Sequence, residues 1–213
     1  MSENLLYPSF LNLEGRKVLI VGGSFVAYQK VASLLETKAK IIVIAPSIID
    51  EIYELDGEFP YKRYIDFQER EYQWGDEKDC FMVIAATNLK ELNLSILNRC
   101  KDQNILVCSV DHPDLCDFFV PSIAAHGDIK VAVSSNGKAP GIAQGLRKII
   151  QNMLLESFCK YLPIVTEFRK KIKDKYPEDK KRHKLIRQFT QRQMKKIEKE
   201  LELTQKGKNL VNK

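Results

Sequence analysis

One pattern near the N-terminus constrains the fold of this chain more than any other feature of its sequence. Residues 17–21 (KVLIV) and 40–45 (KIIVIA) are short, apolar, β-branched runs, as expected of strands buried on both faces. Gly22 and Gly23 follow the first run, and apolar residues at helical spacing begin directly after them. Strand, glycine turn, helix and strand in this order form a βαβ unit, which predicts a parallel sheet.

The alternation of strands and helices continues toward the middle of the chain. Residues 81–86 and 105–110 are predicted strands, with a predicted helix at 89–101 between them. Residues 61–65 are a candidate third strand, followed at 67–74 by a short helix or loop. This order predicts an α/β fold with a Rossmann-like parallel sheet and helices on both faces. Ligands of such sheets bind outside the carboxyl ends of the strands, so the residues after each strand are the candidate site.

A different pattern starts at residue 118. The runs 118–125 and 129–135 are strand-like and are joined by His126-Gly127-Asp128, which predicts an antiparallel hairpin. An isolated hairpin is marginally stable in water and needs a partner surface. We therefore expect the hairpin to pair with a second copy of the chain. The alternative is that it folds back as an edge of its own sheet.

The rest of the chain is predicted to be helical and basic. One helix starts at Pro140, where the missing N–H costs nothing, a second begins near Pro163, and a third spans 178–203. The net charge is +6, and residues 151–213, with 18 Lys and Arg against 8 Asp and Glu, carry +10, so the first 150 residues carry −4. A basic end suits nucleic acid, a membrane surface or a polyanionic small molecule, while the plain alternative is a solvated helical face.

Length and composition set further limits. A chain of 213 residues can form one large domain, or a main domain with small additions. No apolar run reaches the roughly 20 residues that span a bilayer, and the N-terminus lacks the pattern of a signal peptide, so a cytoplasmic protein is expected. The five cysteines are dispersed and are predicted to be reduced thiols. The three histidines lack metal-ligand spacing, so no metal site built by the protein is predicted.

The loop after the first strand has features of a dinucleotide-binding turn. Such a turn needs a glycine, a close approach of backbone to pyrophosphate, and a small residue where the helix meets the strand. Gly22 and Ala27 fit the first and last positions, whereas Ser24 stands in the middle position, where glycine is usual. The pyrophosphate would lie at the helix N-terminus, where free N–H groups favour anions. The alternative is a tight turn that binds nothing.

The candidate cofactor-binding residues follow three of the predicted strands. They are Gly22, Gly23, Ser24, Phe25, Val26, Ala45, Pro46, Ser47, Thr87 and Asn88. An NAD site usually has Asp or Glu at the end of the second strand to hold the ribose hydroxyls. This chain has no carboxylate there before Asp50, so Ser47 is the candidate for the ribose.

Two further features are candidates for chemistry. Asp111 ends the fifth predicted strand, where a carboxylate can take a proton from a bound substrate or can simply cap a turn. A turn of small polar residues before a helix exposes N–H groups that can hold carboxylates, although it can equally be an ordinary capping turn. Its residues are Ser134, Ser135, Asn136, Gly137 and Lys138.

A larger set of residues forms a family pattern. It comprises 11–23, Val26, Ala27, Lys30, 44–46, 85–88, Asn93, Val110, Asp111, Pro113, Asp114, 116–118, Pro121, Ser122, 131–135, Gly137, Lys138, Pro140, Leu146 and Arg147. With this set the chain resembles the precorrin-2 dehydrogenase family, the dehydrogenase and ferrochelatase module of siroheme synthase. The resemblance covers residues 9–150. The chain departs from the family at Ser24 and Phe25, where the family usually continues a run of three glycines.

The resemblance implies a chain of three parts. Residues 1–113 would form an NAD-binding Rossmann-like domain, 114–147 a dimerisation segment with the hairpin, and 148–213 a basic helical C-terminal domain. It implies a homodimer that uses NAD to oxidise the tetrapyrrole precorrin-2 to sirohydrochlorin in siroheme biosynthesis, with Fe²⁺ insertion in some members. Asp111 matches the family's catalytic proton acceptor, and Ser135 matches a serine of the tetrapyrrole cleft.

Two other hypotheses stand beside the dehydrogenase. One is a sirohydrochlorin metal chelatase that does not use NAD, motivated by Ser24. The other is a tetrapyrrole-binding protein without catalytic activity. We expect no nucleic acid partner, because the tail contains no recognised binding module, and no membrane partner.

Overall fold

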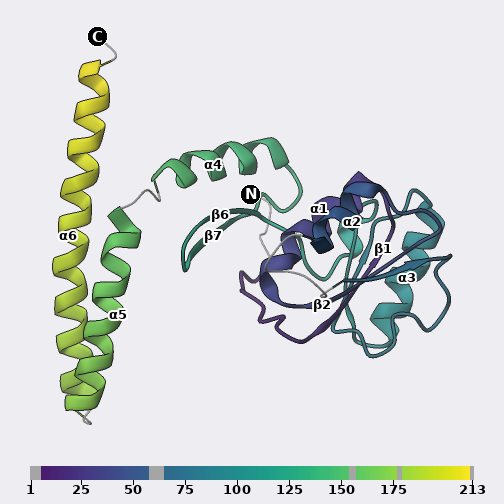
Figure 1. Ribbon diagram of the computed structural model, residues 1–213, viewed down its shortest axis with the longest axis horizontal. Coiled ribbons are helices and arrows are strands. Elements are labelled where there is room, and N and C mark those ends of the chain that lie inside the picture. The colour runs from purple at the N-terminus through teal and green to yellow at the C-terminus, as the bar shows by residue number, and fades with distance from the viewer. Residues whose placement is uncertain (1–5, 58–64, 154–156, 177–178, 212–213) are drawn as a thin grey trace. The chain divides into compact units, whose positions relative to one another are not determined.

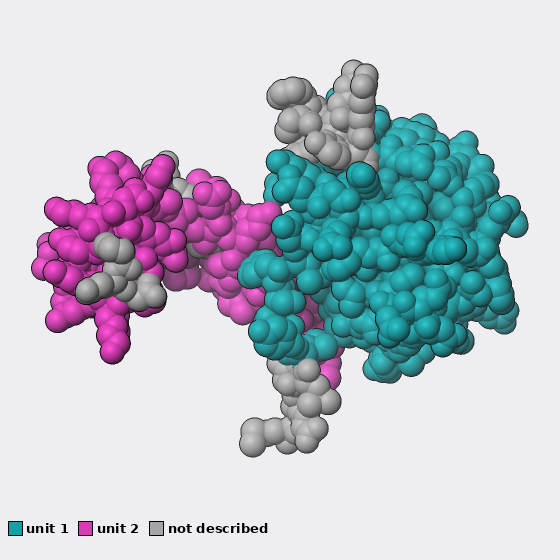
Figure 2. All heavy atoms as spheres, turned by 90° about the horizontal axis from the view of Figure 1, so that it is seen from below, with its two compact units in different colours: residues 1–120 teal, residues 121–213 magenta. Residues whose placement is uncertain are grey.

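The computed structural model describes residues 6–57, 65–153, 157–176 and 179–211. The chain forms two compact units, residues 1–120 and 121–213, which are coloured separately in Figure 2. The boundaries predicted at residues 113 and 147 divide the chain by function, whereas these units are defined by compactness, so the functional division stays a prediction.

Unit 1 is a parallel α/β sheet with helices on both faces (Figure 1), which confirms the predicted fold class. The five strands lie in the order β3-β2-β1-β4-β5, so the direction of winding reverses between β1 and β4. The elements are β1 Lys17–Val21, α1 Phe25–Leu34, β2 Lys40–Ala45, α2 Asp50–Gly57, β3 Ile65–Glu69, β4 Met82–Ala85, α3 Lys90–Asp102 and β5 Leu106–Ser109, with the short 3-10 turns η1 Leu35–Thr37 and η2 Pro113–Leu115.

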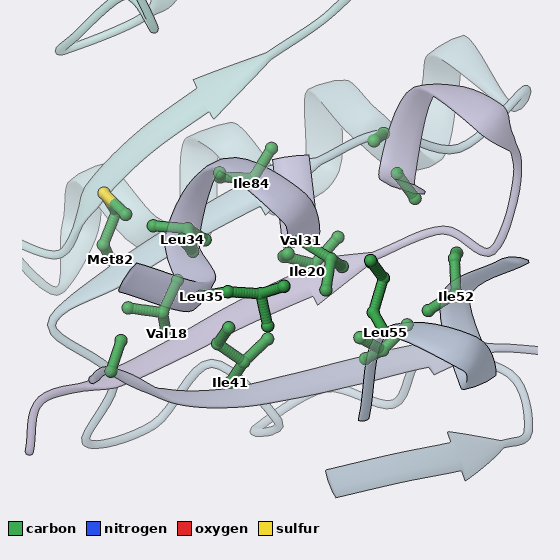
Figure 3. Packing of buried hydrophobic residues seen from close by; sticks show 14 of the residues in the cluster. Val18, Ile20, Val31, Leu34, Leu35, Ile41, Ile52, Leu55, Met82 and Ile84 are labelled. Carbon is green, nitrogen blue, oxygen red and sulfur yellow. The ribbon is translucent and has the colours of Figure 1, made fainter. Parts of the chain in front are cut away.

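The central strand β1 separates two apolar cores. Val18 and Ile20 enter the core that α1 and α2 cover, shown in Figure 3, while Leu19 and Val21 enter the core that α3 covers. All four side chains are buried, and full burial of one such side chain contributes about 1.5–3 kcal/mol. This explains why the strand sequences are continuous apolar runs without polar alternation.

The segment between β3 and β4 is held by a buried carboxylate. The Glu77 side chain is fully buried and accepts hydrogen bonds from Tyr72 Oη (2.5 Å), Gly75 N (2.9 Å), Arg99 Nε (2.8 Å) and Gln103 Nε2 (2.9 Å). Burial alone would raise the pKa of Glu77, but the hydrogen bonds from Tyr72, the backbone, Arg99 and Gln103 together lower it to about 2. The segment is therefore tied to the C-terminal half of α3.

Unit 2 contains the predicted hairpin. Its strands β6 Ser122–His126 and β7 Ile129–Val133 are antiparallel and joined by two residues, and Gly127 at this link has φ +56°, in the left-handed region that favours glycine. Helix α4 Pro140–Met153 packs on both strands. The Gln151 amide donates to Ala125 O (2.8 Å) and accepts from Ala125 N (3.0 Å), so the helix also occupies backbone groups of β6.

Two long helices follow in unit 2. Helices α5 Ser157–Lys175 and α6 Asp179–Val211 lie side by side (Figure 1). Phe168 stacks on Phe189 with ring centroids 3.8 Å apart, and Tyr161 Oη donates to Glu200 at 2.7 Å. These contacts fix the alignment of the two helices.

Several element boundaries differ from the sequence predictions. The third strand is Ile65–Glu69, so the candidate strand at 61–65 lies mostly outside the described residues, and the predicted helix or loop at 67–74 is wrong for its first three residues. Phe67 packs against the core beside β2, which favours the extended chain. Pro163 lies inside α5 and does not begin it. The hairpin begins at Ser122, later than predicted.

None of the helices in the described ranges combines the length and the apolar character needed to cross a bilayer.

Replacing Glu77 with Gln should destabilise unit 1 by about 3 kcal/mol at pH 7, because it removes the charge from a buried pair with Arg99. The pKa of Glu77 lies below its usual 4.5, so its stabilisation is present above pH 4.5 and is lost as the pH falls toward about 2. Urea unfolding followed by the fluorescence of Trp74, the single tryptophan, should show the two proteins converging across that window. The exposed Glu71→Gln is the matched control, and a Glu77→Gln protein as stable as this control would contradict the assignment.

Candidate functional site

The glycine turn after β1 is required by the packing of the neighbouring strand ends. Gly22 has φ +134°, and a Cβ atom there would lie 2.3 Å from Ala86 O, at the end of β4. A Cβ atom on Gly23 would lie 2.1 Å from Ser47 O, after the end of β2. No side chain fits at either position, so the turn after β1 contacts the turns after β2 and β4 through bare backbone.

The start of α1 has unsatisfied polar groups that suit an anion. The first N–H groups of any helix lack intrahelical partners, and the helix dipole favours negative charge there. Ser24 is the N-cap residue of α1 but makes no side-chain cap bond. Its Oγ is buried and is the only such side-chain atom without a hydrogen-bond partner in the part of the chain that the structure describes. Because an orphaned hydroxyl is costly, this atom is consistent with a partner that the protein alone does not supply.

The small residue predicted at the helix–strand contact is present, and a short apolar rim lies beside it. Ala27 is fully buried in the core shared with β1. Phe25 is 59% exposed and stacks on Tyr28 with ring centroids 5.5 Å apart, and Val26 is also exposed. The start of α1 therefore offers polar backbone with apolar side chains next to it, which is the mixed lining typical of cofactor sites.

The end of β2 is bordered by a carboxylate from the next strand. Ala45 is buried, and Pro46 and Ser47 are exposed. Glu69, the last residue of β3, pairs with Ala45 in the sheet register. Partial burial and the neighbouring carboxylates of Glu69 and Asp50 raise the pKa of Tyr53 of α2, so Glu69 lies near this residue. A negative charge thus stands one strand away from the position where NAD sites usually have it.

Asp111 is joined to the turn after β4 by Asn93, which lies in the first turn of α3. Asn93 Nδ2 donates to Asp111 Oδ2 at 2.6 Å and to Thr87 O at 2.9 Å. Asn93 Oδ1 accepts from Thr87 N (3.2 Å) and Thr87 Oγ1 (2.7 Å). Asn93 is fully buried, whereas Asp111 is half-buried. The asparagine therefore connects the residue predicted to be catalytic with a residue predicted to bind the cofactor.

Asn93 belongs to the family pattern described above, but the sequence alone assigned it no functional role. The only local signal is an asparagine in the first turn of a helix that follows a buried strand, a position where a polar side chain must find partners.

The turn that carries Asp111 is folded around a cysteine. Cys116 Sγ accepts from Ser109 N at 3.1 Å and lies 3.3 Å from both Ser109 O and His112 O. The interaction between the neighbouring Cys108 and Cys116 thiols lowers the pKa of Cys116 and raises that of Cys108. These contacts, together with Asp111 N donating to Ser109 Oγ at 3.3 Å, limit the freedom of the Asp111 backbone.

The polar turn at residues 134–138 belongs to unit 2 and leads into α4. Ser134 Oγ accepts from Asn136 N, and Ser135 Oγ accepts from Ala139 N, both at 3.1 Å. Asn136 and Gly137 have positive φ, and Gly137 and Lys138 are exposed. This is the geometry of a capping turn, which was the structural alternative considered for these residues. Lys138 lies exposed at its surface.

The predicted site residues thus divide between the two units. Residues 22–26, 45–47, 87–88 and Asp111 all lie at the carboxyl ends of adjacent strands in unit 1. Residues 134–138 lie in unit 2. Among the described residues, no three His, Cys, Asp or Glu side chains are grouped in a way that could hold a metal ion.

The sequence matches a family model described as "Putative NAD(P)-binding" over residues 9–122, more than half of the chain. The chain belongs to this NAD(P)-binding family. The matched region contains every candidate residue of unit 1, including Asp111.

The chain also resembles curated siroheme synthases. It is 34% identical over 168 residues to the siroheme synthase of Nitrosococcus oceani, a match that covers 79% of this chain. It is 38% identical over 171 residues to the siroheme synthase of Psychrobacter cryohalolentis, a match that covers 80% of this chain. The matches cover only 35% and 32% of the relatives, so the chain spans about a third of their length. The resemblance inferred from the sequence is confirmed by these matches.

A solved structure shares the fold. The structure titled "SirC, precorrin-2 dehydrogenase" superposes with a TM-score of 0.71 at 23% identity, covering 91% of this chain and all of the other. At that identity the match speaks for the fold. This member of the NAD(P)-binding family therefore shares its fold with that solved structure.

Proposed function

We propose that this protein catalyses the NAD-dependent dehydrogenation of precorrin-2 to sirohydrochlorin in siroheme biosynthesis. The observation that carries the proposal is the contact chain from the cofactor turn to a carboxylate: Gly22 packs on Ala86, the neighbouring Thr87 is bonded to Asn93, and Asn93 is bonded to Asp111. The names of the sequence relatives and of the structural neighbour supply the substrate class.

The chemistry divides between cofactor and protein. When bound, the nicotinamide accepts the hydride that leaves the tetrapyrrole. Asp111 takes the accompanying proton on a carboxylate oxygen, so that loss of a hydride and a proton completes the dehydrogenation. The N–H groups at the start of α1 and the Ser24 hydroxyl would hold the pyrophosphate, and Gly22 and Gly23 keep that turn free of side chains.

The substrate is a polycarboxylate, and unit 2 is rich in positive charge. Residues 169–187, around the connection between α5 and α6, contain ten Lys and Arg against three Asp and Glu. Such a concentration of charge attracts anionic substrates over distances of about a Debye length, roughly 10 Å at 0.1 M salt. We assign the exposed Lys138, at the surface of the turn 134–138, to the carboxylates of the macrocycle.

The proposed assembly is a homodimer formed through unit 2. Ile142, Leu146, Ile149 and Met153 follow one face of α4 and are 72%, 46%, 58% and 46% exposed. A continuous apolar stripe of this kind, on a helix that packs against a two-stranded hairpin, fits a second copy of the same surface. We place the reaction in the cytoplasm, where dispersed cysteines remain reduced.

The cofactor is NAD in preference to NADP. Negative charge lies near the end of β2, from Glu69 at the end of β3 and from the first-turn residues Asp50 and Glu51 of α2. The nearby Arg70 is engaged by Asp76 through two bonds of 2.8 Å, so it is not free for a phosphate. A 2′-phosphate would meet like charges, while ribose hydroxyls can donate to a carboxylate.

Incubation of the purified protein with precorrin-2 and NAD⁺ should produce NADH and the spectrum of sirohydrochlorin. Asp111→Asn should lower kcat by about 10²–10⁴-fold, the usual contribution of a general base, with the Kd for NAD⁺ unchanged in calorimetry. Absence of NADH from the wild type would overturn the proposal. Metal insertion when Fe²⁺ is added to sirohydrochlorin would then indicate a chelatase, and binding without turnover a carrier protein.

Glu69→Gln should reduce the preference for NAD⁺ over NADP⁺ by about tenfold, because it removes a charge that repels the 2′-phosphate. Calorimetric titration of both nucleotides into the wild type and the variant measures the ratio of the two Kd values. Glu71→Gln, which removes an exposed carboxylate two residues further on, should leave the ratio unchanged. Equal Kd values for both nucleotides in the wild type would refute the assignment of NAD.

Ile149→Glu should convert a wild-type dimer into a monomer in sedimentation equilibrium, because it places a charge in the apolar stripe of α4. Gln144→Glu introduces the same charge at an exposed polar position of the same helix and should remain dimeric. A monomeric wild type, or an Ile149→Glu protein that stays dimeric, would remove this surface as the interface.

A further inference from the structure

We infer that Asn93 is a positioning residue that fixes Asp111 for proton transfer and ties it to the cofactor edge. The inference deepens the proposed dehydrogenase and rests on it for the role of Asp111. The structural observation behind it does not depend on the proposed function. The amide side chain of Asn93 is fully buried and is hydrogen-bonded to both Thr87 and Asp111.

The hydrogen-bonding capacity of Asn93 is completely used. Its Nδ2 has two N–H donors, which go to Thr87 O and Asp111 Oδ2, and its Oδ1 accepts from Thr87 N and Thr87 Oγ1. With all four bonds made, rotation of the amide by 180° would place a donor against Thr87 N and an acceptor against Asp111. The network therefore allows one orientation of Asn93.

That orientation determines which oxygen of Asp111 is free. Oδ2 accepts the 2.6 Å bond from Asn93, so Oδ1 is the oxygen that the bond leaves for the substrate proton. The Asp111 side chain is thereby held in one direction although it is only half-buried.

The same asparagine connects Asp111 to the place where the cofactor is expected. Thr87 follows Ala86, whose carbonyl would contact a Cβ atom on Gly22 at 2.3 Å. Asn93 is thus bonded to the strand end that packs on the glycine turn and to the carboxylate that follows β5. Proton transfer beside a nicotinamide requires a fixed distance between these two points, and a displacement of about 1 Å costs roughly 100-fold in rate.

A purely structural role is the competing explanation, since Asn93 also satisfies the backbone of Thr87. The two roles separate in Asn93→Asp. The new carboxylate still accepts from Thr87 N and Thr87 Oγ1, but it places an oxygen, in place of the donor, against both Asp111 Oδ2 and Thr87 O. Two of the three bonds to Thr87 are preserved, while Asp111 is repelled.

The experiment compares turnover and stability in a set of matched proteins. Asn93→Asp should lower kcat by about 100-fold, with a far smaller change in KM for NAD⁺. Combined with Asp111→Asn, it recreates the hydrogen bond with donor and acceptor exchanged. The double variant should therefore recover part of the Tm lost in Asn93→Asp, although the donor to Thr87 O stays missing, while its kcat stays as low as that of Asp111→Asn alone. Ser95→Ala, which removes a local bond to Leu92 O on the same helix, is the control and should keep wild-type kcat.

Asn93→Ala serves as a second variant if Asn93→Asp does not fold, because the vacated space can admit water to the Thr87 groups. It should lose kcat by at least about tenfold, because Asp111 is no longer held in one position. A kcat of wild-type size per folded molecule in either variant would overturn the inference, as would a double variant without recovery of Tm. A wild-type protein that produces no NADH would instead refute the proposed dehydrogenase function.

Discussion

The close approach of bare backbone at Gly22 and Gly23 is the constraint on which the rest of the site edge depends. Because no Cβ fits at either residue, the ends of β1, β2 and β4 lie within van der Waals contact of one another. This contact places the first turn of α1 beside the ends of β1 and β4, where the sheet changes its direction of winding. It also sets the position of Thr87, and through Asn93 that of Asp111.

The features that could be predicted from sequence are those that depend on neighbouring residues. The runs that became β1, β2, β4 and β5 are apolar enough to be recognised alone, and Gly22 marks its turn because left-handed backbone favours glycine. Asp111 was singled out from its place after a strand. Each of these signals lies within about ten residues of chain, which is the range over which periodicity and turn chemistry act.

What could not be predicted depends on partners distant in the chain. Asn93 meets Asp111 across 18 residues, and Glu77 meets Arg99 across 22, so neither bond has a local signature. The strand at Ile65–Glu69 depends on its pairing with β2, which outweighs its weak alternation. Pro163 was expected to begin a helix, yet the pairing of α5 with α6 accommodates it inside one.

Two polar contacts hold helix α3, one near its start between Asn93 and Asp111 and one in its second half between Arg99 and Glu77. Its 13 residues span about 20 Å, with Asn93 in the first turn and Arg99 bonded to Glu77 in the second half. A rod held at two such points resists sliding along its axis and rotation about it. Of the elements that border the candidate site in unit 1, α3 is therefore held at two separate points along its length.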